Sequence, residues 1–91
     1  MYSESYTDVC TARDDLLKYA ESTGWTLKSS RFSVHGSRVY DGGDTDAFAV
    51  VTDAEYVEFC FSSDSVGIRV LKMNADRDFN EVVDAIRARL T

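Results

Sequence analysis

The sequence predicts one α+β domain, in which an antiparallel β-sheet of four to five strands is flanked on one face by an N-terminal and a C-terminal helix. Apolar residues recur with helical spacing near the two ends of the chain, whereas the middle alternates between apolar and polar residues. Short turn segments separate the alternating stretches, and antiparallel sheets with segregated helices have this order. The chain has no proline, repeat or linker, so residues 1–91 are expected to form a single domain.

Helical spacing near the N-terminus predicts a first helix from about Thr7 to Thr23. Its expected core stripe consists of Tyr6, Val9, Cys10, Leu16, Leu17 and Ala20. Ser5 or Thr7 is the expected N-cap, because a side-chain oxygen at that position accepts a hydrogen bond from a free backbone amide. Gly24 stands where a left-handed C-terminal cap is expected.

The next segment, "WTLKSSRFSV", alternates like a strand but changes phase within its length. Its apolar positions are Trp25, Leu27, Phe32 and Val34. The first two share one parity and the last two share the other. A β-bulge near Ser29 and Ser30 would bring all four side chains to one face.

A tight turn at Gly36 and Ser37 is expected to follow, because glycine readily adopts the positive φ that short hairpin turns need. The second arm of this hairpin would begin near Val39. His35 would then lie at the hairpin tip.

Three further strands are expected in "AFAVVT", "YVEFCFS" and "VGIRVLKM", joined by the short turns "TDAE" and "SSDS". Alternation predicts the inward side chains to be Phe48, Val50, Val57, Phe59, Phe61, Val66, Ile68 and Val70. The opposite face would be left open by the helices. It would carry Tyr56, Glu58, Cys60, Arg69, Leu71 and Met73.

The C-terminal helix has the clearest pattern in the chain. Its apolar stripe is Phe79, Val82, Val83, Ile86 and Leu90. Asp78 followed by Glu81 three residues later matches a capping box, which predicts the start of the helix.

The negative charge of the protein is concentrated in the middle of the sequence. The net charge is −6, and the segment from Val39 to Ile68 holds seven acids and no lysine or arginine. The remainder holds nine acids and ten bases. Direct binding to nucleic acid or to an anionic membrane is therefore not expected, since both require clustered bases. The expected partner is a protein with a basic surface.

The stretch "VYDGGDTDAF" places Asp41, Asp44 and Asp46 around two glycines and allows three interpretations. Asp and Gly are typical of plain turns. Exposed carboxylates also form interaction surfaces. Finally, carboxylate oxygens bind calcium, although the ligand spacing of an EF-hand loop and its terminal glutamate are missing.

The sequence offers no set of residues typical of catalysis or of cofactor binding. His35 has no partner residues around it that complete a catalytic group, and no glycine-rich phosphate loop opens either helix. The two cysteines lack zinc-ligand spacing. We therefore expect a protein without enzymatic activity, cofactor or metal.

The expected location is the cytoplasm. The chain has no apolar run near the ~20 residues that span a bilayer, and "MYSESYTD" lacks the basic and apolar regions of a signal peptide. In a reducing compartment Cys10 and Cys60 are expected to be free thiols rather than a disulfide.

These observations favour a non-enzymatic protein-binding module whose acidic central segment docks on a basic, nucleic-acid-binding surface of a partner. The predicted partner-binding residues are Asp41, Asp44, Asp46, Asp53, Glu55, Tyr56 and Glu58. In size and charge the chain is similar to inhibitors that phages and mobile elements use against host defence complexes, although no motif carries that likeness. The alternatives are a homodimeric structural or chaperone-like protein that uses the open sheet face, and cation-regulated binding through the Asp41–Asp46 loop.

Overall fold

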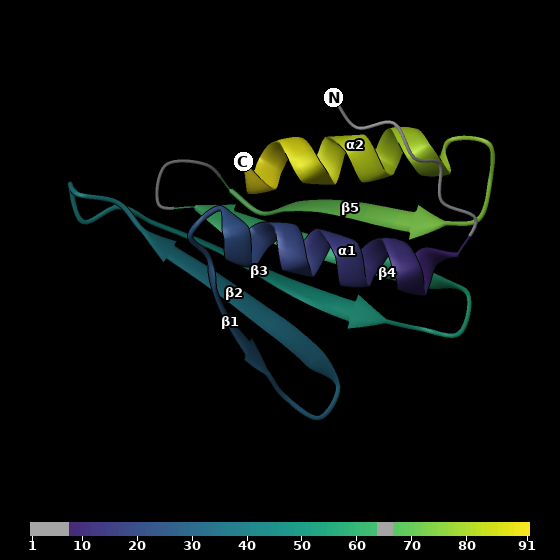
Figure 1. Cartoon of the computed structure of the whole chain (residues 1–91), viewed down its shortest axis with the longest axis horizontal. Helices are drawn as coiled ribbons and strands as arrows, with labels where there is room; N and C mark the ends of the chain where they lie inside the picture. The colour runs from purple at the N-terminus through teal and green to yellow at the C-terminus, as the bar shows by residue number, and fades with distance from the viewer. Residues whose placement is uncertain (1–7, 64–66) are drawn as a thin grey trace.

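The computed structural model describes residues 8–63 and 67–91, which form two layers, with two helices on one face of a five-stranded sheet (Figure 1). The elements are α1 (Val9–Ser22), β1 (Thr26–Ser29), β2 (Ser33–Val39), β3 (Thr45–Thr52), β4 (Tyr56–Ser63), β5 (Arg69–Asn74) and α2 (Phe79–Leu90). Spatial strand order follows the sequence, and neighbouring strands are antiparallel. The predicted α+β fold class is confirmed. Neither helix in the described part of the chain has the length and apolar character needed to cross a membrane.

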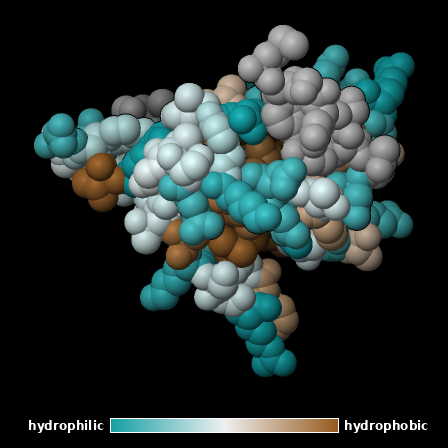
Figure 2. Space-filling model, viewed as in Figure 1, coloured by the Kyte–Doolittle hydropathy of each residue, from teal (hydrophilic) through white to brown (hydrophobic). Residues whose placement is uncertain are grey.

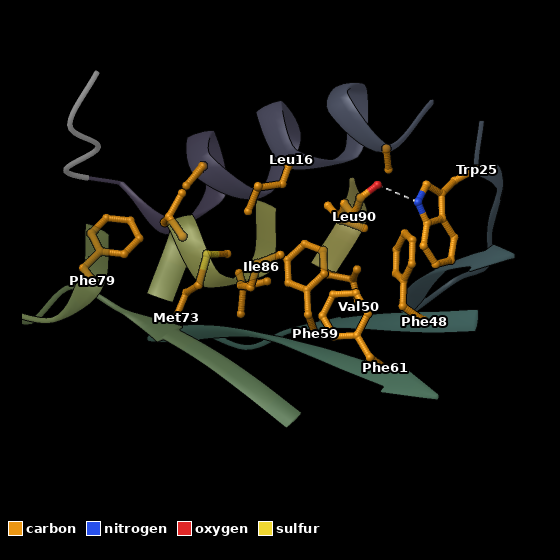
Figure 3. Close-up of a cluster of buried hydrophobic side chains, with 14 residues drawn as sticks. Leu16, Trp25, Phe48, Val50, Phe59, Phe61, Met73, Phe79, Ile86 and Leu90 are labelled. Carbon is orange, nitrogen blue, oxygen red and sulfur yellow. Dashed lines mark hydrogen bonds between the residues drawn. The ribbon is translucent and has the colours of Figure 1, made fainter. Parts of the chain in front are cut away.

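The hydrophobic core lies between the helices and the inner face of the sheet. Leu16, Ile86 and Leu90 point from the helices toward Phe59 and the other inner side chains of the sheet (Figure 3). As predicted, the inward residues of β3 and β4 are Phe48, Val50, Val57, Phe59 and Phe61, all at most 3% exposed. Figure 2 shows mainly hydrophilic side chains on the face seen in Figure 1, with apolar atoms visible near its centre.

Helix α1 begins one residue after Asp8, whose Oδ1 accepts a hydrogen bond of 2.8 Å from the backbone amide of Cys10. The N-cap prediction was therefore wrong, because a nearer carboxylate satisfies the free amide of the first turn. Ser5, Tyr6 and Thr7 lie outside the described residues. Gly24 follows the helix with a φ of 96°, which confirms the predicted left-handed cap.

The buried stripe of α1 also differs from the prediction at one position. Cys10 is exposed, and Ala12 lies in the core with Leu16 and Ala20. Each residue turns an α-helix by about 100°, so Cys10 lies roughly 200° around the axis from Ala12. The spacing of four residues from Ala12 to Ala20 fixes the buried side.

The first hairpin turns earlier than predicted. Strands β1 and β2 pair without interruption from Thr26 opposite Ser37 to Ser29 opposite Val34, so the β-bulge near Ser29 and Ser30 is absent from this hairpin. Residues 30–32 form the turn, where the amide of Ser30 donates to the carbonyl oxygen of Ser33 at 2.8 Å. The apparent change of phase arose because Phe32 belongs to this turn, where it is 79% exposed.

Gly36 accordingly lies inside β2 rather than at a turn, and His35 is not at a hairpin tip. A Cβ atom on Gly36 would lie 2.2 Å from the ring of Phe48. The absence of a side chain at Gly36 thus provides the space for this aromatic ring in the core. The glycine is a packing requirement of the strand and not a signal of chain reversal.

The two faces of β5 are exchanged relative to the prediction. Leu71 pairs with Phe59 and Met73 pairs with Val57, and directly opposed residues share one face of a sheet. Met73 is consequently buried, whereas Ile68 and Val70 are 77% and 52% exposed. A change of one residue in parity moves every side chain of a strand to the other face. Val66 and part of the "SSDS" turn lie outside the described residues.

The open face of the sheet therefore has a different composition from the predicted one. Tyr56, Glu58 and Cys60 lie on it as expected, because they alternate with the buried residues of β4. Arg69, Leu71 and Met73 do not, since they follow the inward parity of β5. The residues of β5 on the open face are instead Val70 and Lys72.

Helix α2 buries the predicted stripe, with Val82 packed against the core from its edge. The capping box is absent, because Asp78 makes no side-chain cap hydrogen bond. Instead Oδ1 of Asp76 accepts a hydrogen bond of 2.9 Å from the backbone amide of Asp78. Glu81 remains in the first turn, where its negative charge is favourable toward the helix dipole.

Candidate protein-binding surfaces

The predicted partner-binding residues divide into two groups at opposite ends of β3. Asp41, Asp44 and Asp46 lie around the β2–β3 connection, whereas the others lie in or just after the β3–β4 turn. From Asp46 to Asp53 the strand extends by roughly 23 Å at ~3.3 Å per residue. Figure 1 shows the two connections at opposite ends of the sheet. The acidic segment is continuous in sequence but does not form one compact patch.

The β2–β3 connection is a hairpin turn. The amide of Tyr40 donates to the carbonyl oxygen of Asp44 at 2.8 Å, and the amide of Gly43 donates to the carbonyl oxygen of Tyr40 at 2.9 Å. Gly43 has a φ of 88°, as expected for the glycine that closes a three-residue hairpin loop. Asp41 and Asp44 are exposed on this turn.

Asp46 differs from the other two aspartates because it is joined to a base. Its Oδ2 accepts a hydrogen bond of 2.7 Å from the hydroxyl of Tyr40, which in turn accepts one of 2.7 Å from Nη2 of Arg38. Arg38 directly precedes the acidic segment and lies opposite Asp46 in the pairing of β2 with β3. In the described part of the chain, no group of three or more His, Cys, Asp or Glu side chains could hold a metal ion.

Arg38 joins the C-terminal ends of both helices to the sheet. Its guanidinium donates to the carbonyl oxygens of Thr23, Leu90 and Thr91 at 3.2–3.4 Å, and it lies 4.4 Å from the ring centroid of Trp25. A positive charge at helix C-termini is stabilising. An adjoining hollow of about 350 Å³ is lined by Arg38, Arg89 and Asp46 among others, so acids and bases are mixed at this end.

The opposite end of the molecule has a more uniform charge. There the β3–β4 turn, the β5–α2 connection and the start of α1 enclose a hollow of about 540 Å³. Its walls include Asp8, Glu55 and Asp76, and Lys72 is the one base among the residues described as lining it. We call the set Asp8, Asp53, Glu55, Tyr56, Glu58 and Asp76 the acidic end.

Tyr56 connects the acidic end to the sheet. The ammonium group of Lys72 lies 4.1 Å from the centroid of the Tyr56 ring. This cation–π contact partly engages Lys72, the basic residue that lines the hollow. The pKa of Tyr56 is raised above its ordinary value, chiefly because the Asp53 carboxylate disfavours a second negative charge nearby. Asp53 also hydrogen-bonds the Tyr56 hydroxyl, and Glu58 adds a smaller effect of the same sign.

Replacing Asp53 with asparagine is therefore expected to lower the pKa of Tyr56 toward its ordinary value of 10.0. The raised pKa stabilises the fold below pH 10, and this contribution is lost as the pH rises through the raised value. A pH titration of the Tyr56 ring by NMR, with Asp44→Asn as a control, would measure the change. Equal pKa values in the parent and the Asp53→Asn variant would show that the carboxylate does not act on the phenol.

The histidine and the two cysteines lie in three different elements of the fold. His35 lies exposed in the middle of β2, where its Nε2 is 2.9 Å from Oγ of Ser33. Cys10 and Cys60 are free thiols, one at the start of α1 and the other on the open face of the sheet.

Sequence reasoning missed Asp8, Lys72 and Asp76 as parts of the acidic end. Asp8 lies outside the acidic central segment, and a capping signal there would have indicated only a helix start. Lys72 lies within β5 and Asp76 just after it, so both fall outside the acidic central segment. Only the antiparallel pairing of β4 with β5 brings them beside Glu55 and Tyr56.

Comparisons with protein-family models, curated proteins and solved structures found no match to this chain.

Proposed function

We propose that this chain is a non-enzymatic protein-binding module that docks its acidic end on a basic surface of a partner protein. The observation that carries the proposal is the convergence of Asp8, Glu55 and Asp76 around one hollow of about 540 Å³. Asp53 adds a further exposed carboxylate in the adjoining turn. A surface on which negative charge predominates accelerates encounter with a positively charged partner and selects against others.

The acidic end is a better candidate than the aspartate turn. At the turn, Asp46 is connected through Tyr40 to Arg38, and Arg89 lines the same hollow. The negative charge of that end is therefore partly compensated. Asp41 and Asp44 contribute exposed charge there, which makes them secondary contacts in the proposal.

A basic partner surface suggests a further step, in which the protein acts as an inhibitor. Surfaces that bind nucleic acid gather lysine and arginine to neutralise phosphates. Carboxylates that occupy such a surface compete with the phosphates for the same bases. This mode of action agrees with the similarity in size and charge to the inhibitors of phages and mobile elements, and it requires no catalytic residue.

The test compares two variants that each remove three negative charges. One carries Asp53→Asn, Glu55→Gln and Asp76→Asn, and the other carries Asp41→Asn, Asp44→Asn and Asp46→Asn. Each would be titrated, with the parent, against a basic partner recovered from the host lysate. The acidic-end variant is expected to lose about tenfold in affinity, since each exposed charge contributes ~0.5 kcal/mol. The aspartate-turn variant should lose less.

Salt provides the second half of the test. The parent complex should weaken as salt rises, because exposed charges are screened over about 8 Å at physiological ionic strength.

A competition experiment tests the inhibitor mechanism. Nucleic acid bound to the partner should be displaced as the protein is added. Equal affinities of all three proteins at low salt would refute docking through the acidic end, and a ternary complex with nucleic acid would refute the inhibitor mechanism.

A further inference from the structure

The outer face of the sheet, opposite the helices, is a second surface, which meets the acidic end at Tyr56 and Glu58. Strand pairing places its side chains in rows that cross the sheet. The middle row runs Lys28, His35, Ala49, Cys60 and Val70, and the neighbouring rows are Thr26, Ser37, Ala47 and Ser62 on one side and Ser33, Val51, Glu58 and Lys72 on the other. Near the centre of this face, the small side chains of Ala47, Ala49, Cys60 and Ser62 lie side by side on β3 and β4.

Exposed aliphatic side chains surround these small residues. Val39, Val51, Ile68 and Val70 are 69%, 41%, 77% and 52% exposed, respectively. Beside Ile68, a hollow of about 270 Å³ lies over Ala47 and Ala49. Protruding aliphatic groups next to a shallow hollow allow two sheets to interdigitate when they pack face to face. The described parts of the two helices lie on the opposite face of the sheet and leave this one uncovered (Figure 1).

The distribution of charge over the molecule favours a second copy of this chain as the partner of the outer face. The outer face carries Lys28, Lys72 and Glu58, whereas the whole chain has a net charge of −6. Two copies that approach through their acidic ends would repel each other. They can approach through their outer faces with little repulsion, and Glu58 of one copy is complementary to a lysine of the other. We infer that the outer face of the sheet is the interface of a homodimer.

The size of the face indicates how stable this dimer is. Five strands at ~4.8 Å spacing and about six residues at ~3.3 Å give roughly 480 Å² on each copy, or about 1,000 Å² in total. This total lies near the lower limit for specific interfaces. The dimer is therefore expected to form at high protein concentration and to dissociate on dilution.

Sedimentation velocity between about 5 and 500 µM tests the inference on the full chain. The mass should rise from 10.2 kDa toward twice that value. The variant Val70→Lys should remain monomeric throughout, because it places an unpaired charge in the interface. The matched control Ala85→Lys adds the same charge on an exposed position of α2 and should dimerise like the parent.

The two cysteines provide a measurement that locates the interface. Cys60 lies in the middle row of the outer face, whereas Cys10 is exposed at the start of α1. Brief alkylation with iodoacetamide, followed by mass spectrometry, should show that labelling of Cys60 relative to Cys10 falls at least severalfold between 5 and 500 µM. In Val70→Lys the ratio should not change with concentration.

Several outcomes would overturn the dimer. One is a parent that stays at 10.2 kDa at 500 µM. Others are equal dimerisation of Val70→Lys and the parent, or a Cys60 to Cys10 ratio that is independent of concentration. The mass should persist at high salt, whereas docking of the acidic end should weaken. The two proposals can thus fail separately.

Discussion

Replacing Phe59 with alanine is expected to destabilise the protein by about 3–5 kcal/mol. Phe59 is fully buried in β4, and its ring centroid lies 5.9 Å from that of Phe48 and 6.0 Å from that of Phe61. Truncation would remove these aromatic contacts and leave a cavity beneath both helices, which the surrounding side chains fill only in part. Urea unfolding of the parent and the variant measures the difference.

Cys60 provides the matched control for this substitution because it is the next residue of the same strand and points to the outer face. Cys60→Ala should change the free energy of unfolding by less than about 1 kcal/mol. A loss below about 1 kcal/mol in Phe59→Ala, or a larger loss in Cys60→Ala, would mean that the two faces of β4 are exchanged.

The inward face was predicted well in the strands where phenylalanine occupies only one parity, with Phe48 in β3 and Phe59 and Phe61 in β4. In β4, Val57, Phe59 and Phe61 alternate with polar or smaller residues, so only one face can be buried. In "VGIRVLKM" both parities carry apolar side chains, and local alternation does not decide between them. Pairing with β4 determines which parity of β5 is buried, because directly opposed residues of paired strands share a face.

The candidate site shows the same division between local and long-range information. The acidic segment was visible in the sequence, since seven acids without a base form a local pattern. The acidic residues are divided between two ends of the molecule because the strand β3 lies between them. The compensation of Asp46 by Arg38 depends on the register of the β2–β3 hairpin, which places the two residues opposite each other. The addition of Asp8 and Asp76 to the other end depends on contacts between distant parts of the chain.

Replacing Gly36 with valine is expected to destabilise the protein by about 3 kcal/mol or more, although valine is a better strand residue than glycine. The backbone of Gly36 does not have a positive φ, so the loss does not come from backbone strain. It comes from the ring of Phe48, which a Cβ atom would approach to 2.2 Å. The ring is 3% exposed and packs edge-on against Trp25 at 4.9 Å, so it has little freedom to move away.

Urea unfolding with two further variants separates this steric mechanism from a general effect of losing a glycine. Gly42→Val should change stability by less than about 0.5 kcal/mol, because a Cβ atom at this exposed turn position meets nothing within 4 Å. In a Phe48→Leu background, Gly36→Val should be less destabilising by about 0.5–3 kcal/mol, since the smaller side chain leaves room for the methyl groups. The same loss in both backgrounds would show that Phe48 is not the reason for a glycine in β2.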